Sequence, residues 1–196
     1  MTATVVSRSE RRKAETRRRL MEAAADVYAN VGVEGATIGA ITEAADVGLG
    51  TFYLHFDDKD DIASAVAGDL LARIGLAARE AAANADPDDA LGMHRAATRA
   101  VCHVAADEAR LLHALYRWHG RAGGSGLRET FVANLAVALE RAMASGRLRR
   151  QDPLLAAHAV LGLYAESILF WASSGNDDWD ALAEFLERAS VGALSQ

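Results

Sequence analysis

Basic residues are concentrated at the start of the chain, where they could bind the phosphate groups of a nucleic acid. Residues 1–20 contain two acidic side chains and seven basic ones, namely Arg8, Arg11, Arg12, Lys13, Arg17, Arg18 and Arg19. Their net charge is +5, whereas the whole chain carries −6, so the remainder carries −11. A basic segment on an acidic body is expected where one region meets phosphate and the rest repels it. A solvated run of charge is the alternative.

Residues 35–59 form the second informative stretch. Two short amphipathic patterns at helical spacing lie on either side of residues 46–48, with apolar faces formed by Ile38, Ile41, Ala45, Leu49, Phe52 and Phe56. These faces leave Thr51, Tyr53 and His55 pointing elsewhere, and Thr37 is a candidate N-cap. The stretch therefore predicts a helix, a tight turn and a helix. Two core helices of any all-α domain are the alternative that periodicity leaves open.

The turn and second helix resemble those of TetR-family transcriptional regulators. That family reads roughly Ala-Gly-Val-Ser-x-Gly-Thr-Leu/Phe-Tyr-x-His/Tyr-Phe-x-x-Lys, and the chain matches it in register at Ala45, Val47, Gly50, Thr51, Phe52, Tyr53, His55, Phe56 and Lys59. The likeness extends back through residues 16–20 and Gly32 to Thr37, about the first third of the chain. Gly48 departs from it, because a helix-capping serine is common there.

This resemblance implies which residues contact DNA. Backbone contacts are expected from Thr37, Thr51, Tyr53, His55 and Lys59, and contacts near base edges from Leu49, Gly50 and Tyr53. Residues 32–56 contain no Lys or Arg, so the positive charge must come mainly from the segment before them and from Lys59. We therefore expect strong contributions from Arg11, Arg12, Lys13, Arg17, Arg18 and Arg19, some of them in the minor groove.

Composition predicts an almost wholly helical fold of about nine helices. Hydrophobic residues make up 51% of the chain, only two prolines occur and alternating β-branched runs are missing. We expect a disordered basic arm at 1–9, a three-helix helix-turn-helix DNA-binding domain at 10–57, and a C-terminal helical ligand-binding and dimerisation domain at 58–196. No segment is typical of secretion or of membrane spanning, so a cytoplasmic protein is predicted.

The predicted helices differ in how much apolar face they carry. The first, from about Glu10 to just before Gly32, has a stripe formed by Leu20, Ala24, Val27 and Val31. The fourth begins after residues 57–58, reaches about Ala83 and has a stripe formed by Ile62, Val66, Leu70 and Ile74. Further helices are expected at 88–106, 108–118, 127–145, 154–174 and 178–194, with a glycine-rich connector at 120–126.

The resemblance also implies an effector pocket in the C-terminal domain. Its candidate lining residues are Met93, His94, Ala97, Val101, Leu115, Tyr116, Trp118, Phe131, Leu135, Tyr164, Ile168 and Trp171. The mixture of aromatic and aliphatic groups suggests a medium-sized apolar or aromatic effector, with Arg99, Arg117 or Glu166 orienting a polar end. Ordinary core packing is the alternative for each residue.

The last two helices are predicted to form a dimer interface. Residues 154–174 are apolar nearly all round, which requires neighbours on more than one face. A four-helix bundle with a twofold copy would provide them, using Leu154, His158, Leu161, Ala165, Trp179, Leu182, Phe185, Leu186 and Ala189. Packing within one chain is the alternative.

Other functions have weaker support in the residues. The chain has no catalytic or dinucleotide-binding motif, so we expect neither an enzyme nor a cofactor. Cys102, the single cysteine, excludes a disulfide framework, and metal sensing by Cys102, His103, Asp107 and His113 lacks paired i, i+4 ligands. The favoured function is a repressor that binds a palindromic DNA operator as a homodimer and is released by a small-molecule effector. An activator, a regulator without an effector, and a helical protein that binds RNA or an acidic partner remain alternatives.

Overall fold

The computed structural model describes residues 7–122, 125–146 and 148–194, and these ranges contain nine helices and no strand. The helices are α1 (Arg8–Gly35), α2 (Ile38–Ala44), α3 (Leu49–Phe52), α4 (Lys59–Ala83), α5 (Ala90–Asp107), α6 (Ala109–Ala122), α7 (Ser125–Ala144), α8 (Pro153–Ser174) and α9 (Trp179–Leu194). The prediction of an all-α fold is confirmed.

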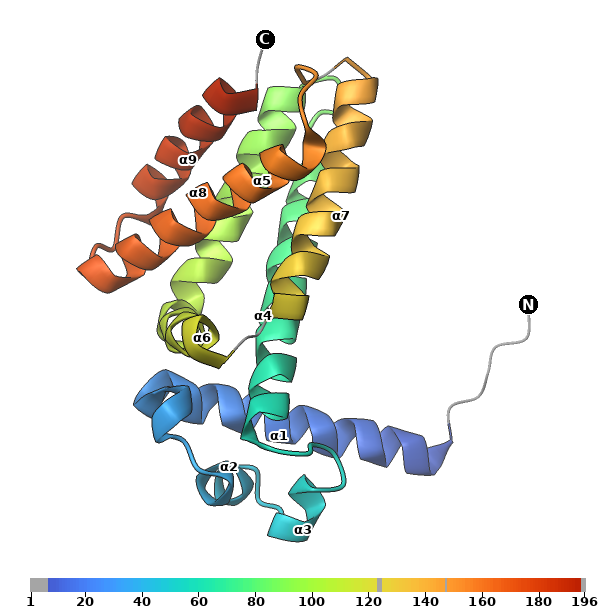
Figure 1. Cartoon of the computed structure of the whole chain (residues 1–196), viewed down its shortest axis with the longest axis vertical. Coiled ribbons are helices and arrows are strands. Elements are labelled where there is room, and N and C mark those ends of the chain that lie inside the picture. The colour runs from blue at the N-terminus through green and yellow to red at the C-terminus, as the bar shows by residue number, and fades with distance from the viewer. Residues whose placement is uncertain (1–6, 123–124, 147, 195–196) are drawn as a thin grey trace.

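The helices form two parts joined by α4. Figure 1 shows α1, α2 and α3 at one end of the molecule, while α4 rises from them towards the other end, where α5, α7, α8 and α9 lie. Within the upper part α4 packs along α5, α5 packs against α9, and α7 packs against α8. Helix α6 packs against α1, so it belongs to both parts.

Helix α1 begins earlier than the sequence pattern predicts. Ser7 is its N-cap: the Ser7 hydroxyl accepts from the Glu10 N–H, and the Glu10 carboxylate accepts from the Ser7 N–H. Residues 8 and 9, which we expect in the disordered arm, are therefore helical, and residues 1–6 lie outside the described part. At the other end Gly32 has φ 75° and ψ 165°, a backbone conformation that glycine adopts without strain.

The first core cluster joins the helix-turn-helix part to α4 and α6. Its fully buried members include Leu20, Tyr28, Ile41, Phe52, Phe56, Ile62 and Leu70. Val31 is 57% exposed, so its predicted place in the α1 stripe is wrong. The buried stripe of α1 instead continues from Leu20 and Ala24 to Tyr28, and the chain leaves the regular helix at Gly32.

Two further clusters form the core of the upper part. One contains Cys102, Ile168, Leu182 and Leu186 from α5, α8 and α9, and the other contains Val132, Leu139 and Met143 from α7 against α8. Helix α7 ends as predicted, since Gly146 after it has φ 74°. Asp152 caps α8 by accepting from the N–H groups of Leu154 and Leu155.

The glycine-rich connector is shorter than the sequence predicts. Helix α6 reaches Ala122 and α7 begins at Ser125, so of the expected connector 120–126 only residues 123–124 are not assigned to a helix, and these lie outside the described residues. Leu111, Leu115 and Trp118 are buried at helical spacing in α6 and hold it against the first core cluster. A glycine costs about 1 kcal/mol inside a helix, and α6 nevertheless continues through Gly120 to Ala122.

Candidate nucleic-acid interface

Helix α3 and the turn after it form the candidate reading surface. Regular helix covers only Leu49–Phe52, and the hydrogen bonds from the N–H groups of Leu54, His55 and Phe56 to carbonyls of residues 51 and 52 continue it as a turn. Phe52 and Phe56 are buried as predicted. Leu49 does not share their face: it is exposed, as is Tyr53, so both can meet a base edge.

The turn between α2 and α3 differs in one detail from the resemblance. Asp46 has φ 50°, in the left-handed region that aspartate tolerates better than most residues. Gly48 is the N-cap of α3 and supplies no side-chain hydrogen bond, so the position that often holds serine leaves this helix start uncapped. Within this first turn the Thr51 N–H donates to the carbonyl oxygen of Gly48 at 2.8 Å.

The residues predicted to contact DNA near α2 and α3 differ in their exposure and in the hydrogen bonds they already make. The Thr37 hydroxyl is exposed but already accepts from the Ala40 N–H as the N-cap of α2. Gly50 is exposed and Thr51 is half-buried on the outer part of α3. His55 is half-buried, and its Nδ1 is buried without a hydrogen-bond partner. Burial, with the nearby charges of Lys13 and Arg17, lowers the His55 pKa, which keeps the ring neutral at neutral pH.

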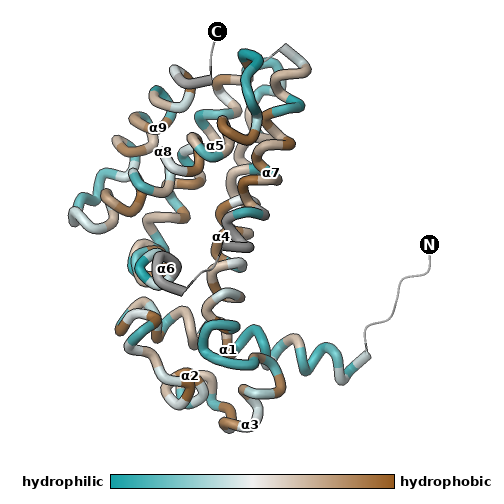
Figure 2. Tube along the Cα trace, in the orientation of Figure 1, coloured by the Kyte–Doolittle hydropathy of each residue, from teal (hydrophilic) through white to brown (hydrophobic). Residues whose placement is uncertain are grey.

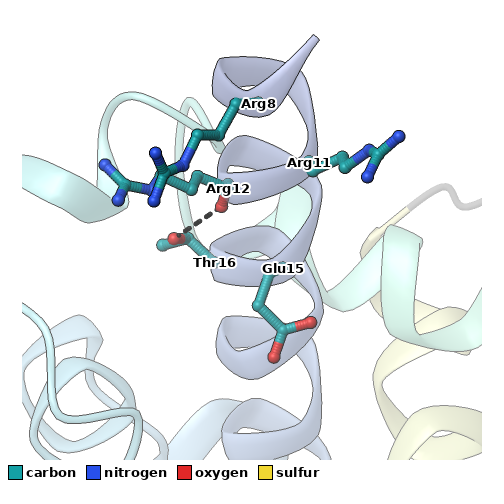
Figure 3. A pocket seen from close by; sticks show the side chains of 5 residues that line it. All are labelled: Arg8, Arg11, Arg12, Glu15 and Thr16. Carbon is teal, nitrogen blue, oxygen red and sulfur yellow. Dashed lines mark hydrogen bonds between the residues drawn. The ribbon is translucent and has the colours of Figure 1, made fainter. Parts of the chain in front are cut away.

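The first turns of α1 carry the exposed cations. Figure 2 shows this half of α1 as largely hydrophilic. Arg8, Arg11 and Arg12 line a shallow hollow with Glu15 and Thr16, and Figure 3 shows Arg8 and Arg12 extending to one side of the helix and Arg11 to the other. A second hollow lies between α1 and the turn after α3 and is lined by Glu10, Lys13, Ala14, Arg17, Leu54 and His55.

Arg18 is exposed but is paired with carboxylates of its own helix. Its guanidinium pairs with the carboxylates of Glu15 and Glu22 on the same helix. The hydrogen bonds to these carboxylates, that to Glu15 first, raise the Arg18 pKa. Because both neighbouring charges are negative, the three side chains together carry −1. A phosphate would have to displace these carboxylates.

The other predicted cations lie against the protein backbone. Arg17 donates to the carbonyl oxygen of His55, Arg19 donates to that of Ala45, and Lys59 donates to those of Glu34 and Ala36. All three cations are half-buried, whereas Arg8, Arg11, Arg12 and Lys13 are exposed. With Arg18 paired to carboxylates, the structure thus divides the basic residues into three groups that the sequence could not distinguish.

Most of the candidate pocket residues are spread over the three core clusters. Leu115 and Trp118 belong to the first core cluster, Val101, Tyr164, Ile168 and Trp171 to the second, and Leu135 to the third. Trp118 Nε1 donates to Asp60 Oδ1 at 3.1 Å, so this ring holds the junction of α6 with α4. Met93, Ala97 and Phe131 are half-buried on α5 and α7, and Tyr116 is exposed, with its hydroxyl on Glu166.

A cluster of polar side chains that includes two of the candidates, His94 and Tyr164, lies between α5, α8 and α9. The Tyr164 hydroxyl is 2.6 Å from Thr98 Oγ1, and His94 Nε2 is 2.8 Å from Ser190 Oγ. Burial lowers the His94 pKa and raises the Tyr164 pKa, so both groups are neutral at neutral pH. Nearby, Trp171 Nε1 is buried without a hydrogen-bond partner.

The proposed dimer residues divide into exposed and buried ones. Leu154, His158 and Phe185 are exposed, and Leu161, Ala165, Trp179 and Ala189 are half-buried. Leu182 and Leu186 are 2% and 0% exposed because they face α5 and α8 in the second core cluster, so their predicted place in an interface is wrong. The exposed apolar side chains that the prediction omitted are Leu155 and Phe170, at 70% and 68% exposure.

Helix α8 has a second feature that follows from its apolar surface. By length and composition alone it is the one helix in the described ranges that could cross a membrane, although little of its apolar segment is buried within the chain. Glu166 interrupts the apolar run near its middle. An apolar, poorly covered helix indicates a surface that meets another partner.

The residues considered for a metal site diverge. Cys102 is buried and burial raises its thiol pKa to about 11, while His103 is exposed. The described residues contain no group of three side chains suited to hold a metal ion. The metal-sensing alternative thus has no geometric support in this part of the chain.

The sequence matches models of two segments of known regulators. Residues 20–66 match the model described as bacterial regulatory proteins of the tetR family, and residues 94–190 match the C-terminal domain of AefR-like transcriptional repressors. The HTH-type transcriptional regulator YhgD of Bacillus subtilis (strain 168), described as uncharacterized, is 25% identical over 188 residues, which cover 90% of this chain and 95% of YhgD.

Solved structures of other regulators share the fold of this chain. The regulator FadR of Bacillus subtilis, solved with stearoyl-CoA, aligns with a TM-score of 0.74 at 20% identity, covering 89% of this chain and 97% of FadR. RolR, solved with resorcinol, aligns with a TM-score of 0.65 at 23% identity, covering 91% and 89%. Together, the two matching segments and the helix-turn-helix geometry show that this chain belongs to the TetR family of DNA-binding transcriptional regulators.

Proposed function

We propose that this protein is a ligand-responsive repressor that binds a palindromic DNA operator as a homodimer and is released by a small, largely apolar or aromatic effector. The carrying observation is the hollow between α1 and the turn after α3, where Lys13 and Arg17 lie with Leu54 and His55. In this arrangement Leu49, Gly50 and Tyr53 meet base edges while Arg11, Arg12 and Lys13 hold phosphates. Residues 10–57 then act as the DNA-binding domain and 58–196 as the effector and dimerisation domain, in the cytoplasm.

The homodimer supplies the second reading helix. A palindrome presents two half-sites about 34 to 36 Å apart, so two copies of α3 must be held at that spacing. The exposed apolar side chains Leu154, Leu155 and Phe170 on α8 and Phe185 on α9 support a twofold interface between these helices. The half-buried residues Leu161, Ala165, Trp179 and Ala189 lie beside them.

The effector is proposed to act through α6 and α4. Helix α6 packs on α1, and Trp118 near its end donates to Asp60 in the first turn of α4. A ligand that moves α6 therefore moves both the beginning of α4 and the helix that carries the cations. FadR, solved with stearoyl-CoA, and RolR, solved with resorcinol, support an effector with an apolar or aromatic body. Complete switching requires about a 10⁴-fold preference for one state.

Selection of bound duplexes from a random DNA pool tests the DNA half of this proposal. The full chain is expected to enrich a short palindrome whose half-site centres lie about one helical turn apart. Enrichment of a single half-site would contradict the dimer, and no enrichment would contradict sequence-specific binding. A matched pool of RNA tests the alternative, since preferential retention of RNA would favour it.

Trp118→Phe tests the route from effector to DNA. Phenylalanine keeps an apolar ring in the core but removes the indole N–H that bonds Asp60. We expect unchanged affinity for the enriched palindrome and a shift of the effector concentration at half-release by about 5-fold to 150-fold, the usual range of allosteric coupling. Release is measured with a long-chain acyl-CoA and with a dihydroxybenzene. A half-release concentration equal to that of the native chain would contradict this route.

A further inference from the structure

We propose that Arg17, Arg19 and Lys59 are positioning residues that cap the C-terminal ends of the three helices of the DNA-binding domain. Each cation donates to backbone carbonyls at or just beyond the end of a different helix. Lys59 Nζ lies 3.1 Å from Glu34 O and 3.2 Å from Ala36 O, at the end of α1.

The other two cations come from α1 itself. Arg19 Nη2 lies 2.6 Å from the carbonyl oxygen of Ala45, the C-cap of α2. Arg17 Nη1 lies 2.9 Å from the carbonyl oxygen of His55, in the turn that continues α3. The Arg17 guanidinium also lies 4.1 Å from the centre of the Phe56 ring, so it is fixed at both the backbone and the core.

These helix ends need donors that their own sequences lack. The last carbonyls of a helix have no partner within it, and they form the negative end of the helix dipole. A basic residue in the last turn commonly supplies the compensation, but α1, α2 and α3 have none there. Cations 23 to 38 residues away in sequence supply it instead. Helices as short as α2 and α3 are not stable alone, so such contacts determine where they lie.

The three contacts connect the positions of α2 and α3 to α1 and α4. Arg17 and Arg19 lie two positions apart on α1 and hold the ends of α3 and α2, so α1 sets how these two helices sit together. Lys59 is the first residue of α4 and holds the end of α1. A displacement of α4 therefore pulls on α1, and through α1 on the recognition helix.

A comparison of methionine variants with a phosphate-binding control distinguishes capping from DNA contact. Methionine keeps an unbranched apolar stem but removes the charge and the donors, so Arg17→Met, Arg19→Met and Lys59→Met are compared with the exposed Arg12→Met. Affinity for a short duplex of random sequence is measured as a function of KCl concentration. Each phosphate contact removed lowers the slope of log K against log salt by about 0.9.

The expected results differ between the two groups. Arg12→Met lowers the slope and leaves the melting temperature unchanged. The three cap variants leave the slope unchanged and lower the melting temperature measured without DNA. They also bind the duplex enriched by the native protein less selectively. Its affinity relative to the random duplex falls by at least about tenfold, as expected when a reading helix is misplaced. Arg17→Lys, Arg19→Lys and Lys59→Arg keep a cationic donor and should recover most of this preference.

Each result decides between the two roles. A fall in slope equal to that of Arg12→Met assigns the cation to a phosphate and overturns its capping role, as does a melting temperature that does not change. A cap variant that fails to fold supports the proposal, since loss of an exposed phosphate contact does not unfold a domain. If the native protein enriches no duplex, the proposed operator binding fails, while the melting temperatures still test the caps.

Discussion

Phe185→Glu is expected to give a monomeric protein. Its affinity for a palindromic operator should be at least about 100-fold lower than that of the native chain. This factor is the lower end of the affinity gain obtained when two binding modules are joined. Phe185 is 50% exposed on α9, and in the proposed homodimer it would be buried against the partner. A carboxylate there would be removed from water without a compensating cation, which opposes association strongly. Sedimentation velocity and binding to the full and half palindromes measure the two effects.

The control for this prediction is Val137→Glu. Val137 is an exposed apolar residue on α7, a helix that the proposed interface of α8 and α9 does not use, so the same substitution there should leave both association and affinity unchanged. Leu155→Glu, on α8, should act like Phe185→Glu because it lies on the proposed interface. A Phe185→Glu protein that stays dimeric, or a monomer that binds the full palindrome as tightly as before, would contradict the proposed interface.

Phe52→Ala is expected to destabilise the DNA-binding domain by about 3 to 5 kcal/mol, the usual cost of removing a buried phenylalanine. Phe52 is fully buried in the first core cluster, with ring centres 5.4 Å from Tyr53 and 5.7 Å from Phe56. Because Phe52 shares the first core cluster with residues of α1 and α4, operator binding should be lost together with stability. Urea unfolding followed by circular dichroism measures the loss.

Leu54→Ala is the matched control for Phe52→Ala. Leu54 lies two residues further along the same turn but is 72% exposed, so its truncation should change stability by less than about 0.5 kcal/mol. Equal losses in the two variants would contradict the burial pattern of α3. A DNA-binding defect of Leu54→Ala without a stability defect would instead add this side chain to the reading surface.

Local patterns in the sequence were sufficient for the fold and the family. Helix periods, caps such as Asp58 and Asp152, and the matched residues from Ala45 to Lys59 are each determined by neighbours a few positions away. They predicted the nine helices with ends shifted by a few residues, except at the connector, where α6 is extended. The extension follows Trp118, which is buried in the first core cluster and bonds Asp60 of α4.

Residues whose role depends on distant contacts were predicted less well. Arg12 and Arg17 are the same residue type on the same helix, yet one is exposed and the other bonds the carbonyl of His55, 38 residues away. Likewise Phe185 and Leu186 are adjacent apolar residues, and only packing against α5 and α8 makes the second a core residue.

The sequence by itself thus determined that this protein is an all-helical TetR-family regulator with a weakly charged reading helix behind a basic helix start. Only the tertiary structure decided which cations remain free for phosphate, which apolar residues remain for a partner, and that α3 is a single turn of regular helix. The physical reason is that helix formation and capping depend on residues within one or two turns. The burial and hydrogen bonding of a side chain depend instead on segments that only folding brings together.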